Sequence, residues 1–143
     1  MFIGTSYPKL DDKFRLILPA KFRDRLAGGV VLTKGQENCL VLLTAAEFAA
    51  RSGSLAGNLP IGSLGSRGLN RHYFHLADEQ TPDGQGRILV NSGLREWADL
   101  GRDLVVVGVG KHIEIWNPEK HKAFMDATAE AFANFNEGEV TLN

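Results

Sequence analysis

The chain has 143 residues, and its content of 43% hydrophobic and 23% charged residues is ordinary for a folded, water-soluble protein. Sixteen lysines and arginines against seventeen aspartates and glutamates give a net charge of -1, so any contact with nucleic acid has to come from a local basic patch. The single cysteine excludes an intrachain disulfide. The lack of a signal-peptide pattern, and of any apolar run near the roughly 20 residues of a membrane span, favours a cytoplasmic protein with no membrane partner.

The first third of the chain is predicted to alternate short strands and short helices. The predicted order is a strand at 15–18, a helix at 20–26, a hairpin at 30–33 and 40–43, and a helix at 45–51. Thr44 and Glu47 have the spacing of a capping box, which fixes the start of that last helix.

The same order of elements is predicted again toward the C-terminus. It consists of a strand at 87–90, a helix at 92–97, a hairpin at 105–109 and 113–116, and a long helix at 118–135. Asn117 followed by Pro118 is a typical start for that long helix. Between the two sets, residues 52–58 are small and Gly-rich and predict a linker, whereas 59–76 are compatible with a further helix. The acidic residues 136–143 are expected to fray.

A shift of 72 positions aligns the two sets as copies of one unit built around a D-x-x-x-R motif. The aligned pairs are Asp11 with Asp83, Arg15 with Arg87, and Arg23 with Arg95. Each motif arginine is followed by three aliphatic residues. About 45 residues per copy are too few for a separate core. We therefore expect the two copies to interlock around a pseudo-two-fold axis and to share one sheet-rich core.

Charge is distributed unevenly between the ends of the chain. Residues 9–25 carry six positive against three negative side chains, whereas residues 118–143 carry two positive against five negative. This polarity suits a molecule with a DNA-binding face and a back face. On charge alone, Lys9, Lys21 and Arg23 are candidates for that DNA-binding face.

The motif itself fits recognition of phosphate or guanine. The arginine offers a planar fork of donors, the aspartate can bond its own turn and hold the guanidinium, and Gly84 and Gly86 allow a close backbone approach. The alternative is a plain turn followed by a surface ion pair, a reading that the second copy at a matching place makes less favoured.

With both motifs in place, the sequence resembles the MraZ family, bacterial relatives of the AbrB-type swapped-hairpin regulators. The segments that carry the resemblance are 2–4, 10–15, 18–23, 74–77, 83–89 and 115–117. The resemblance implies an α+β fold, mostly β with flanking helices, in which two AbrB-like repeats form a double-psi or swapped-hairpin type of barrel. The implied divisions are repeat 1 at 5–47, a linking helical segment at 48–75, repeat 2 at 76–119, and a C-terminal helix and tail at 120–143.

The resemblance also implies a function. Such proteins are sequence-specific transcriptional regulators of the division and cell-wall gene cluster, and they bind short direct repeats of double-stranded DNA at their own promoter. Their chains assemble into rings of about eight to twelve subunits. As regulators that bind chromosomal DNA, they are expected on the nucleoid in the cytoplasm. Carried over by position, the DNA-binding residues are Asp11, Lys13, Arg15, Asp83 and Arg87.

Two other classes of function compete with this one. In the first, the chain is a structural or protein-interaction ring whose motif arginines form salt bridges between subunits. In the second it is an enzyme, which is disfavoured because the sequence offers no nucleophile–base pair, no cofactor loop and no small-molecule substrate site. His72 and His75 lack the further ligands of a metal site, and Cys39 lies in an apolar strand, so neither metal nor cofactor is expected.

Overall fold

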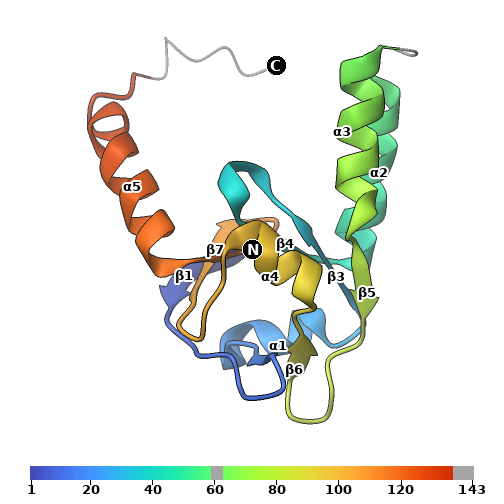
Figure 1. Cartoon of the computed structure of the whole chain (residues 1–143), viewed down its shortest axis with the longest axis vertical. Coiled ribbons are helices and arrows are strands. Elements are labelled where there is room, and N and C mark those ends of the chain that lie inside the picture. Colours follow the sequence, from blue (N-terminus) through green and yellow to red (C-terminus); the bar gives the residue numbers. More distant parts are fainter. Residues whose placement is uncertain (59–62, 137–143) are drawn as a thin grey trace.

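The computed structural model describes residues 1–58 and 63–136, and a six-stranded antiparallel sheet lies at its centre (Figure 1). In spatial order the strands are β1 (Phe2–Ser6), β7 (Val105–Gly110), β8 (Ile113–Trp116), β4 (Leu40–Thr44), β3 (Val30–Lys34) and β5 (Asp78–Gln80). The hairpins β3–β4 and β7–β8 are those predicted, and they meet where β4 pairs with β8. The loop between β3 and β4 contains a 3-10 turn (Gln36–Asn38).

The strand order has the symmetry of the sequence repeat. Each outer strand comes from one half of the chain and pairs with the hairpin of the other half, since β1 pairs with β7 and β5 pairs with β3. The sheet therefore reads as outer strand, hairpin, hairpin, outer strand from either end. The two halves share one sheet. At each edge of the sheet, the outer strand and the hairpin that it pairs with come from different halves of the chain.

A separate two-stranded ribbon joins the halves a second time. Strand β2 (Arg15–Ile17) pairs antiparallel with β6 (Arg87–Leu89), with Leu16 opposite Ile88. Both of these side chains are buried in the main core. Repeat-related pairs continue through that core, namely Leu18 with Val90, Phe22 with Leu94, and Leu26 with Ala98. One hydrophobic core thus receives equivalent contributions from both copies.

Short helices follow each strand of the ribbon. After β2, a 3-10 turn (Ala20–Phe22) runs into α1 (Arg23–Leu26), and after β6 comes α4 (Ser92–Ala98). The Asn91 side chain caps α4 by accepting a hydrogen bond from the Leu94 amide at 3.3 Å. Both helices were predicted within one residue, although the first begins as a 3-10 turn.

Longer helices extend to one side of the sheet as two arms. Helices α2 (Ala45–Asn58) and α3 (Leu64–His75) lie side by side as one arm, and α5 (Pro118–Ala133) forms the other (Figure 1). The predicted caps are confirmed: Thr44 Oγ1 accepts from the Glu47 amide at 3.1 Å, and Asn117 accepts from two amides of α5. The Phe48 and Tyr73 rings stack at 5.2 Å and hold α2 against α3.

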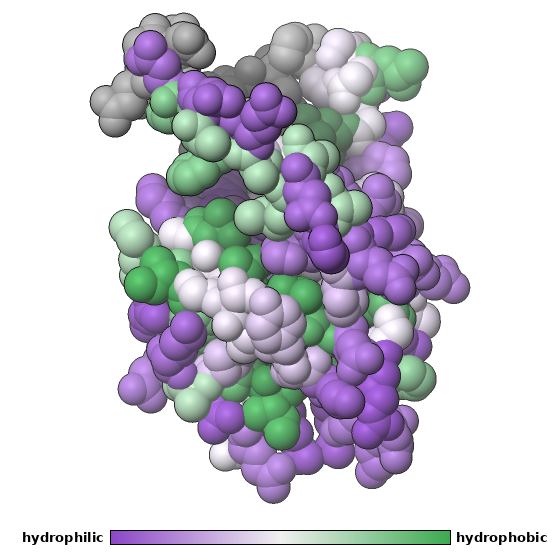
Figure 2. Space-filling view, turned by 90° about the vertical axis from the view of Figure 1, so that its left-hand side faces the viewer, coloured by the Kyte–Doolittle hydropathy of each residue, from purple (hydrophilic) through white to green (hydrophobic). Residues whose placement is uncertain are grey.

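The arms leave large apolar side chains in solvent. The exposed side chains on α5 and just beyond it are Phe124, Met125, Phe132 and Phe135, and those on α3 are Leu64, Leu69 and Phe74. Phe132 retains 84% of its accessible surface. The face that carries α5 mixes hydrophobic and hydrophilic patches (Figure 2). In the described part of the chain, no helix combines the length and the apolar character needed to cross a membrane.

The fold is α+β, as predicted, but it differs from the sequence-based expectation in several details. Helical residues outnumber strand residues, and the sheet has open edges at β1 and β5 and is not closed into a barrel. The predicted linker at 52–58 is the second half of α2, because the Arg51–Glu47 ion pair and the Ser52 bond to the Phe48 carbonyl continue the helix. Helix α5 ends at Ala133, before the predicted limit at 135, and most of the tail predicted to fray lies outside the described residues.

Candidate nucleic-acid interface

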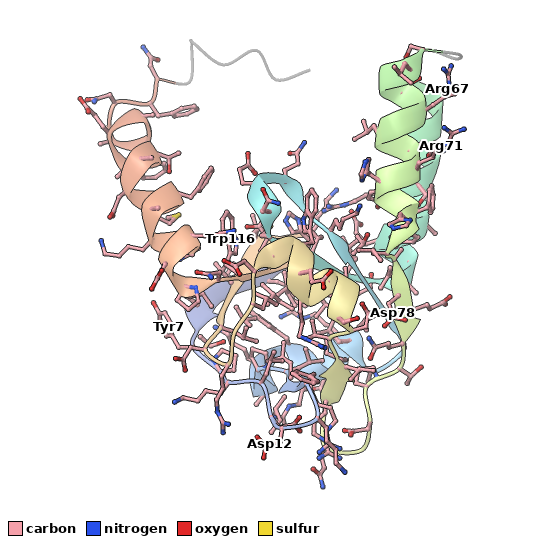
Figure 3. The ribbon with its side chains drawn as sticks, in the orientation of Figure 1. Tyr7, Asp12, Arg67, Arg71, Asp78 and Trp116 are labelled. Atoms are coloured by element: carbon pink, nitrogen blue, oxygen red, sulfur yellow. The ribbon has the colours of Figure 1, made fainter. Side chains whose placement is uncertain are left out.

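The two D-x-x-x-R loops lie together at the end of the molecule opposite the helical arms. In Figure 3, Asp12 of the first loop marks this end, whereas Arg67 and Arg71 mark the far part of α3. The end of the molecule that carries the arms is therefore not uniformly acidic, because α3 places Arg67 and Arg71 there.

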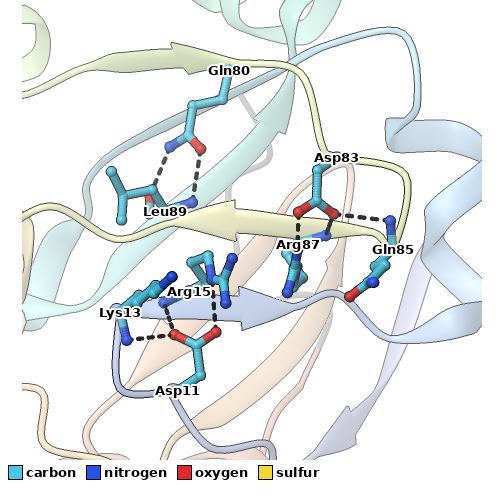
Figure 4. A network of polar contacts seen from close by, with 8 residues as sticks. All are labelled: Asp11, Lys13, Arg15, Gln80, Asp83, Gln85, Arg87 and Leu89. Carbon is cyan, nitrogen blue, oxygen red and sulfur yellow. Dashed lines mark hydrogen bonds and ion pairs between the residues drawn. The ribbon is translucent and has the colours of Figure 1, made fainter.

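The first loop is a turn closed by its own aspartate. Asp11 Oδ1 accepts hydrogen bonds from the amides of Lys13 and Arg15, both at 2.9 Å, and Oδ2 accepts from Arg15 Nε at 2.7 Å (Figure 4). The backbone closes the same turn, since the Phe14 amide donates to the Asp11 carbonyl at 3.0 Å. Aspartate is suited to this position because its short side chain can reach amides two and four residues further along.

The second loop repeats these contacts atom for atom. Asp83 Oδ1 accepts from the amides of Gln85 and Arg87, both at 2.9 Å, and Oδ2 accepts from Arg87 Nε at 2.7 Å (Figure 4). The Gly86 amide donates to the Asp83 carbonyl at 2.9 Å. Two sequences that share only the aspartate and arginine thus fold into one geometry, which identifies those two residues as its determinants.

Hydrogen bonding keeps both loop aspartates charged. The backbone amide of Arg15 is the main cause that holds the pKa of Asp11 below its ordinary value, and the backbone amide of Arg87 does the same for Asp83. The paired guanidinium lowers each pKa further. Each carboxylate is consequently a stable acceptor for the arginine Nε at neutral pH.

The ribbon places both arginines on its outer face. Leu16 and Ile88 point into the core, so the alternation of a strand turns Arg15 and Arg87 outward. The loops are also tied across the ribbon, because the Leu18 amide donates to the Gly86 carbonyl and the Val90 amide donates to the Phe14 carbonyl, each at 2.9 Å. The two guanidinium groups are therefore displayed at a fixed spacing.

Each guanidinium has N–H donors that its aspartate does not use. The aspartate uses only Nε, and across residues 1–58 and 63–136 neither Nη atom of Arg15 or Arg87 donates a hydrogen bond to the protein. Their side chains remain 31% and 23% exposed. A clamped Nε with available Nη donors is a preorganised site for a phosphate oxygen or for the O6/N7 edge of guanine.

A second pair of arginines supports the loops from behind. Arg23 Nε donates to the Leu18 carbonyl at 2.9 Å, and Arg95 Nη1 donates to the Val90 carbonyl at 2.5 Å. Arg23 lies against the second loop at Gly86, whereas Arg95 lies against the first loop at Phe14. Arg23 was predicted as a DNA-binding residue from its charge, and the structure engages it with the protein backbone.

The other basic candidates differ in how close they lie to the two arginines. Lys13 is exposed in the first loop beside Arg15. Lys9 pairs with Asp103 at 3.5 Å on the surface, and Lys21 lies 5.1 Å above the Phe22 ring, next to Gly4. The structure thus brings together the motif residues and Lys13, and it does not bring Lys21 into the loops.

Sequence reasoning assigned no role to two supporting side chains. Gln80 forms two hydrogen bonds with the backbone of β6. Its Nε2 donates to the Leu89 carbonyl at 2.7 Å, and its Oε1 accepts from the Leu89 amide at 2.8 Å (Figure 4). No pattern in the sequence marks this contact. Arg95 could have been found, since it aligns with Arg23 at the 72-residue shift.

Other potential sites in the described residues have ordinary explanations. No group of three or more His, Cys, Asp or Glu side chains within residues 1–58 and 63–136 is placed to hold a metal ion. His72 bonds to Lys34 Nζ at 2.7 Å. Burial raises the pKa of Cys39 to about 12, so this thiol is unreactive at neutral pH.

Comparison with known proteins identifies the family of the chain. A family model described as "MraZ protein, putative antitoxin-like" matches residues 1–56 and 73–142. The chain is 46% identical to the transcriptional regulator MraZ of Salinispora arenicola over 138 residues, 96% of each chain. It is 47% identical to that of Frankia casuarinae and 42% identical to that of Micrococcus luteus, in both cases over 96% of this chain and 95% of the relative. The chain belongs to the MraZ family of proteins.

Proposed function

We propose that this protein is a transcriptional regulator that binds double-stranded DNA sequence-specifically at its own promoter. In this proposal the ligand is a set of short direct repeats upstream of a division and cell-wall gene cluster. The observation that carries it is the pair of loops at one end of the ribbon, each with an arginine fixed through Nε and two Nη donors available. The names of the relatives support the regulatory role.

The proposed DNA-binding residues are Asp11, Lys13, Arg15, Asp83 and Arg87. The arginines contact phosphate or guanine, Lys13 adds a phosphate contact, and the aspartates set the guanidinium orientation. Lys9, Lys21 and Arg23 take a lesser part, because each already has a partner or neighbour within the protein. Regulation of this kind takes place on the nucleoid in the cytoplasm and requires no cofactor.

We further propose that the exchanged outer strands correspond to the AbrB-type swapped hairpin. The proposed divisions are repeats at 5–47 and 76–119, a linking helical segment at 48–75, and a C-terminal segment at 120–143. The pairing of β1 with β7 and of β5 with β3 supports interlocked halves.

A ring of about eight to twelve subunits would explain how a nearly neutral chain binds DNA firmly. The exposed apolar side chains on the two separate arms provide two different surfaces, as a head-to-tail contact between subunits requires. Several subunits in a ring would present the same loops at a fixed spacing to successive direct repeats. Weak contacts by each subunit would then add up.

The test is DNA binding measured by fluorescence anisotropy across a salt series. The probes are the DNA upstream of the gene that encodes this chain and a scrambled duplex of the same composition. Wild type is expected to prefer the upstream DNA and to lose affinity steeply as salt rises. The Arg15→Ala/Arg87→Ala variant is expected to lose at least about tenfold in affinity for the upstream DNA.

Two control variants separate the contribution of the motif from that of net charge. Arg67→Ala/Arg71→Ala removes the same charge from the far part of α3 and should keep the preference for the upstream DNA. Arg15→Lys/Arg87→Lys keeps the charge but loses the planar fork, so it should retain salt-dependent binding and lose much of the preference. If the Arg15→Ala/Arg87→Ala protein bound like wild type, the loops would not be the interface. If that variant instead dissociated into smaller species on sizing chromatography, the arginines would be subunit contacts.

A further inference from the structure

The two loops share their hydrogen bonds but differ at the residue immediately before the arginine. In both loops this residue has a positive φ, +75° at Gly86 and +61° at Phe14. Glycine adopts this conformation freely, whereas a side chain as bulky as that of phenylalanine is strained in it. The first loop therefore holds an aromatic ring at a position where the backbone favours glycine, which points to a use for the ring.

Core packing does not account for that ring. Phe14 remains 46% exposed, in contrast to the buried Leu16 two residues later. The ring stacks on Arg95, whose Cζ lies 3.6 Å from the ring centroid. Arg95 is itself anchored to the Val90 carbonyl. The ring is therefore held in place by a guanidinium on one side while much of its surface stays in solvent.

The second loop excludes an equivalent ring. A Cβ atom at Gly86 would lie 2.8 Å from Arg23 Nε, so the supporting arginine occupies the space that a side chain would need. Gly84 adds no side chain either. The first loop thus presents Asp12, Lys13 and Phe14 beside its arginine, while the second presents only the side chain of Gln85 between its aspartate and arginine. The chain is pseudo-symmetric in backbone and asymmetric in the surface that it offers.

We propose that Phe14 is a specificity-determining residue, and that its exposed edge contacts the 5-methyl group of a thymine next to the position held by Arg15. This inference rests on the proposed DNA-binding function. The thymine methyl is the apolar group that base pairs present in the major groove, and an exposed aromatic edge is its natural complement. Because the stack on Arg95 already fixes the ring, binding costs little side-chain entropy. The first loop then imposes a base preference that the second loop does not.

Replacement of thymine by deoxyuridine tests the contact, because it removes that methyl group alone. Affinity would be measured for the upstream DNA with thymine or deoxyuridine at each thymine of one repeat, with wild type, Phe14→Gly and Phe14→Tyr. Wild type is expected to lose about threefold to fivefold at one thymine position, the size of one buried methyl group. Phe14→Gly should show no loss at that position, and Phe14→Tyr, which keeps the ring, should show the wild-type loss. Gln85→Gly in the second loop is the matched control and should also show the wild-type loss.

Two results with Phe14→Gly would overturn the contact. In the first, Phe14→Gly keeps the full loss of affinity on replacement of thymine by deoxyuridine. In the second, Phe14→Gly binds the thymine and deoxyuridine DNAs more weakly than wild type by the same factor, which would mean that the ring only shapes the loop. Circular dichroism and thermal unfolding of Phe14→Gly establish that the variant is folded.

If wild type did not prefer the upstream DNA over scrambled DNA, the proposed function would fail along with this inference. If wild type did prefer it without any thymine coupling, only this inference would fail.

Discussion

The first and second loops show how one chain can reuse a backbone and vary its surface. Asp11 and Asp83 build the same turn through the same three hydrogen bonds, and each holds an arginine Nε at 2.7 Å. Around this common frame the side chains diverge, with Phe14 stacked on Arg95 in one loop and Gly86 packed under Arg23 in the other. The aspartate and the arginine thus fix the geometry of the turn in both loops. The residue before the arginine can carry a side chain in the first loop and is restricted to glycine in the second.

The largest effect is expected from breaking the core beneath the two loops. Leu16→Ala and Ile88→Ala remove equivalent, fully buried side chains of the ribbon, and each should lower the free energy of unfolding by about 2–5 kcal/mol. Since both lie in one core, each variant should still unfold in a single transition that involves both halves. Chemical denaturation followed by circular dichroism measures this. A separate transition for one half would contradict the shared core.

Replacing one motif arginine at a time should show how much each loop contributes to DNA affinity and to sequence preference. Arg15→Ala and Arg87→Ala should each weaken binding to the upstream DNA by about tenfold, the lower part of the range for a lost bidentate contact. Both should lower affinity, but Arg15→Ala should reduce the preference over scrambled DNA more, because its loop carries Phe14. Anisotropy titrations with both duplexes provide the comparison. Equal loss of preference in the two variants would mean that the loops read DNA alike.

A smaller effect, on the free energy of unfolding, is expected from substituting the residue that precedes each motif arginine. Gly86→Ala forces a Cβ into a left-handed conformation 2.8 Å from Arg23 Nε and should destabilise the fold by about 1–2 kcal/mol. Phe14→Gly relieves strain and loses the stack on Arg95, so its stability should stay within about 1 kcal/mol of wild type. Denaturant unfolding measures both. A larger loss for Phe14→Gly than for Gly86→Ala would show that the ring is primarily structural.

The smallest effect is expected from pH near neutrality. The pKa values of Asp11 and Asp83 are lowered, chiefly by the backbone amides of Arg15 and Arg87, so the charged carboxylates stabilise the folded loops. For groups with a depressed pKa this contribution is present above the ordinary value of 3.8 and is lost as pH falls through the lowered value. The two aspartates should therefore add no pH dependence to DNA binding between about pH 5 and 8. Carboxyl titration by NMR should find both below 3.8, and a value above it would refute the hydrogen-bonded loop.

The repeat explains which features could be predicted from the sequence. The motif residues, both hairpins and the helix starts at Thr44 and Asn117 follow from local patterns, and the structure confirms these elements. The edge strands β1 and β5 were not predicted, because each is defined by its pairing with the other half of the chain. Helix α2 was predicted too short, because a small, Gly-containing sequence resembles a linker until its neighbours in space are known.

Some supporting contacts of the candidate interface could not be predicted from the sequence for a related reason. Whether Arg23 faces DNA or the protein depends on the carbonyl of Leu18, which only the folded turn brings within reach. The role proposed for Phe14 depends on a positive φ and on a guanidinium 81 positions further along the chain. The local sequence pattern thus locates the motif, whereas long-range packing decides which contacts each copy makes within the protein.

Site-specific photo-crosslinking tests most directly the claim that both loops touch DNA. A photoreactive amino acid would replace Lys13 in the first loop, Gln85 in the second, or Lys122 on α5 as the control, all of them exposed. Irradiation with the upstream DNA should give crosslinks from positions 13 and 85 and none from position 122. Crosslinks from α5 without any from the loops would place DNA on the opposite end of the molecule and contradict the account.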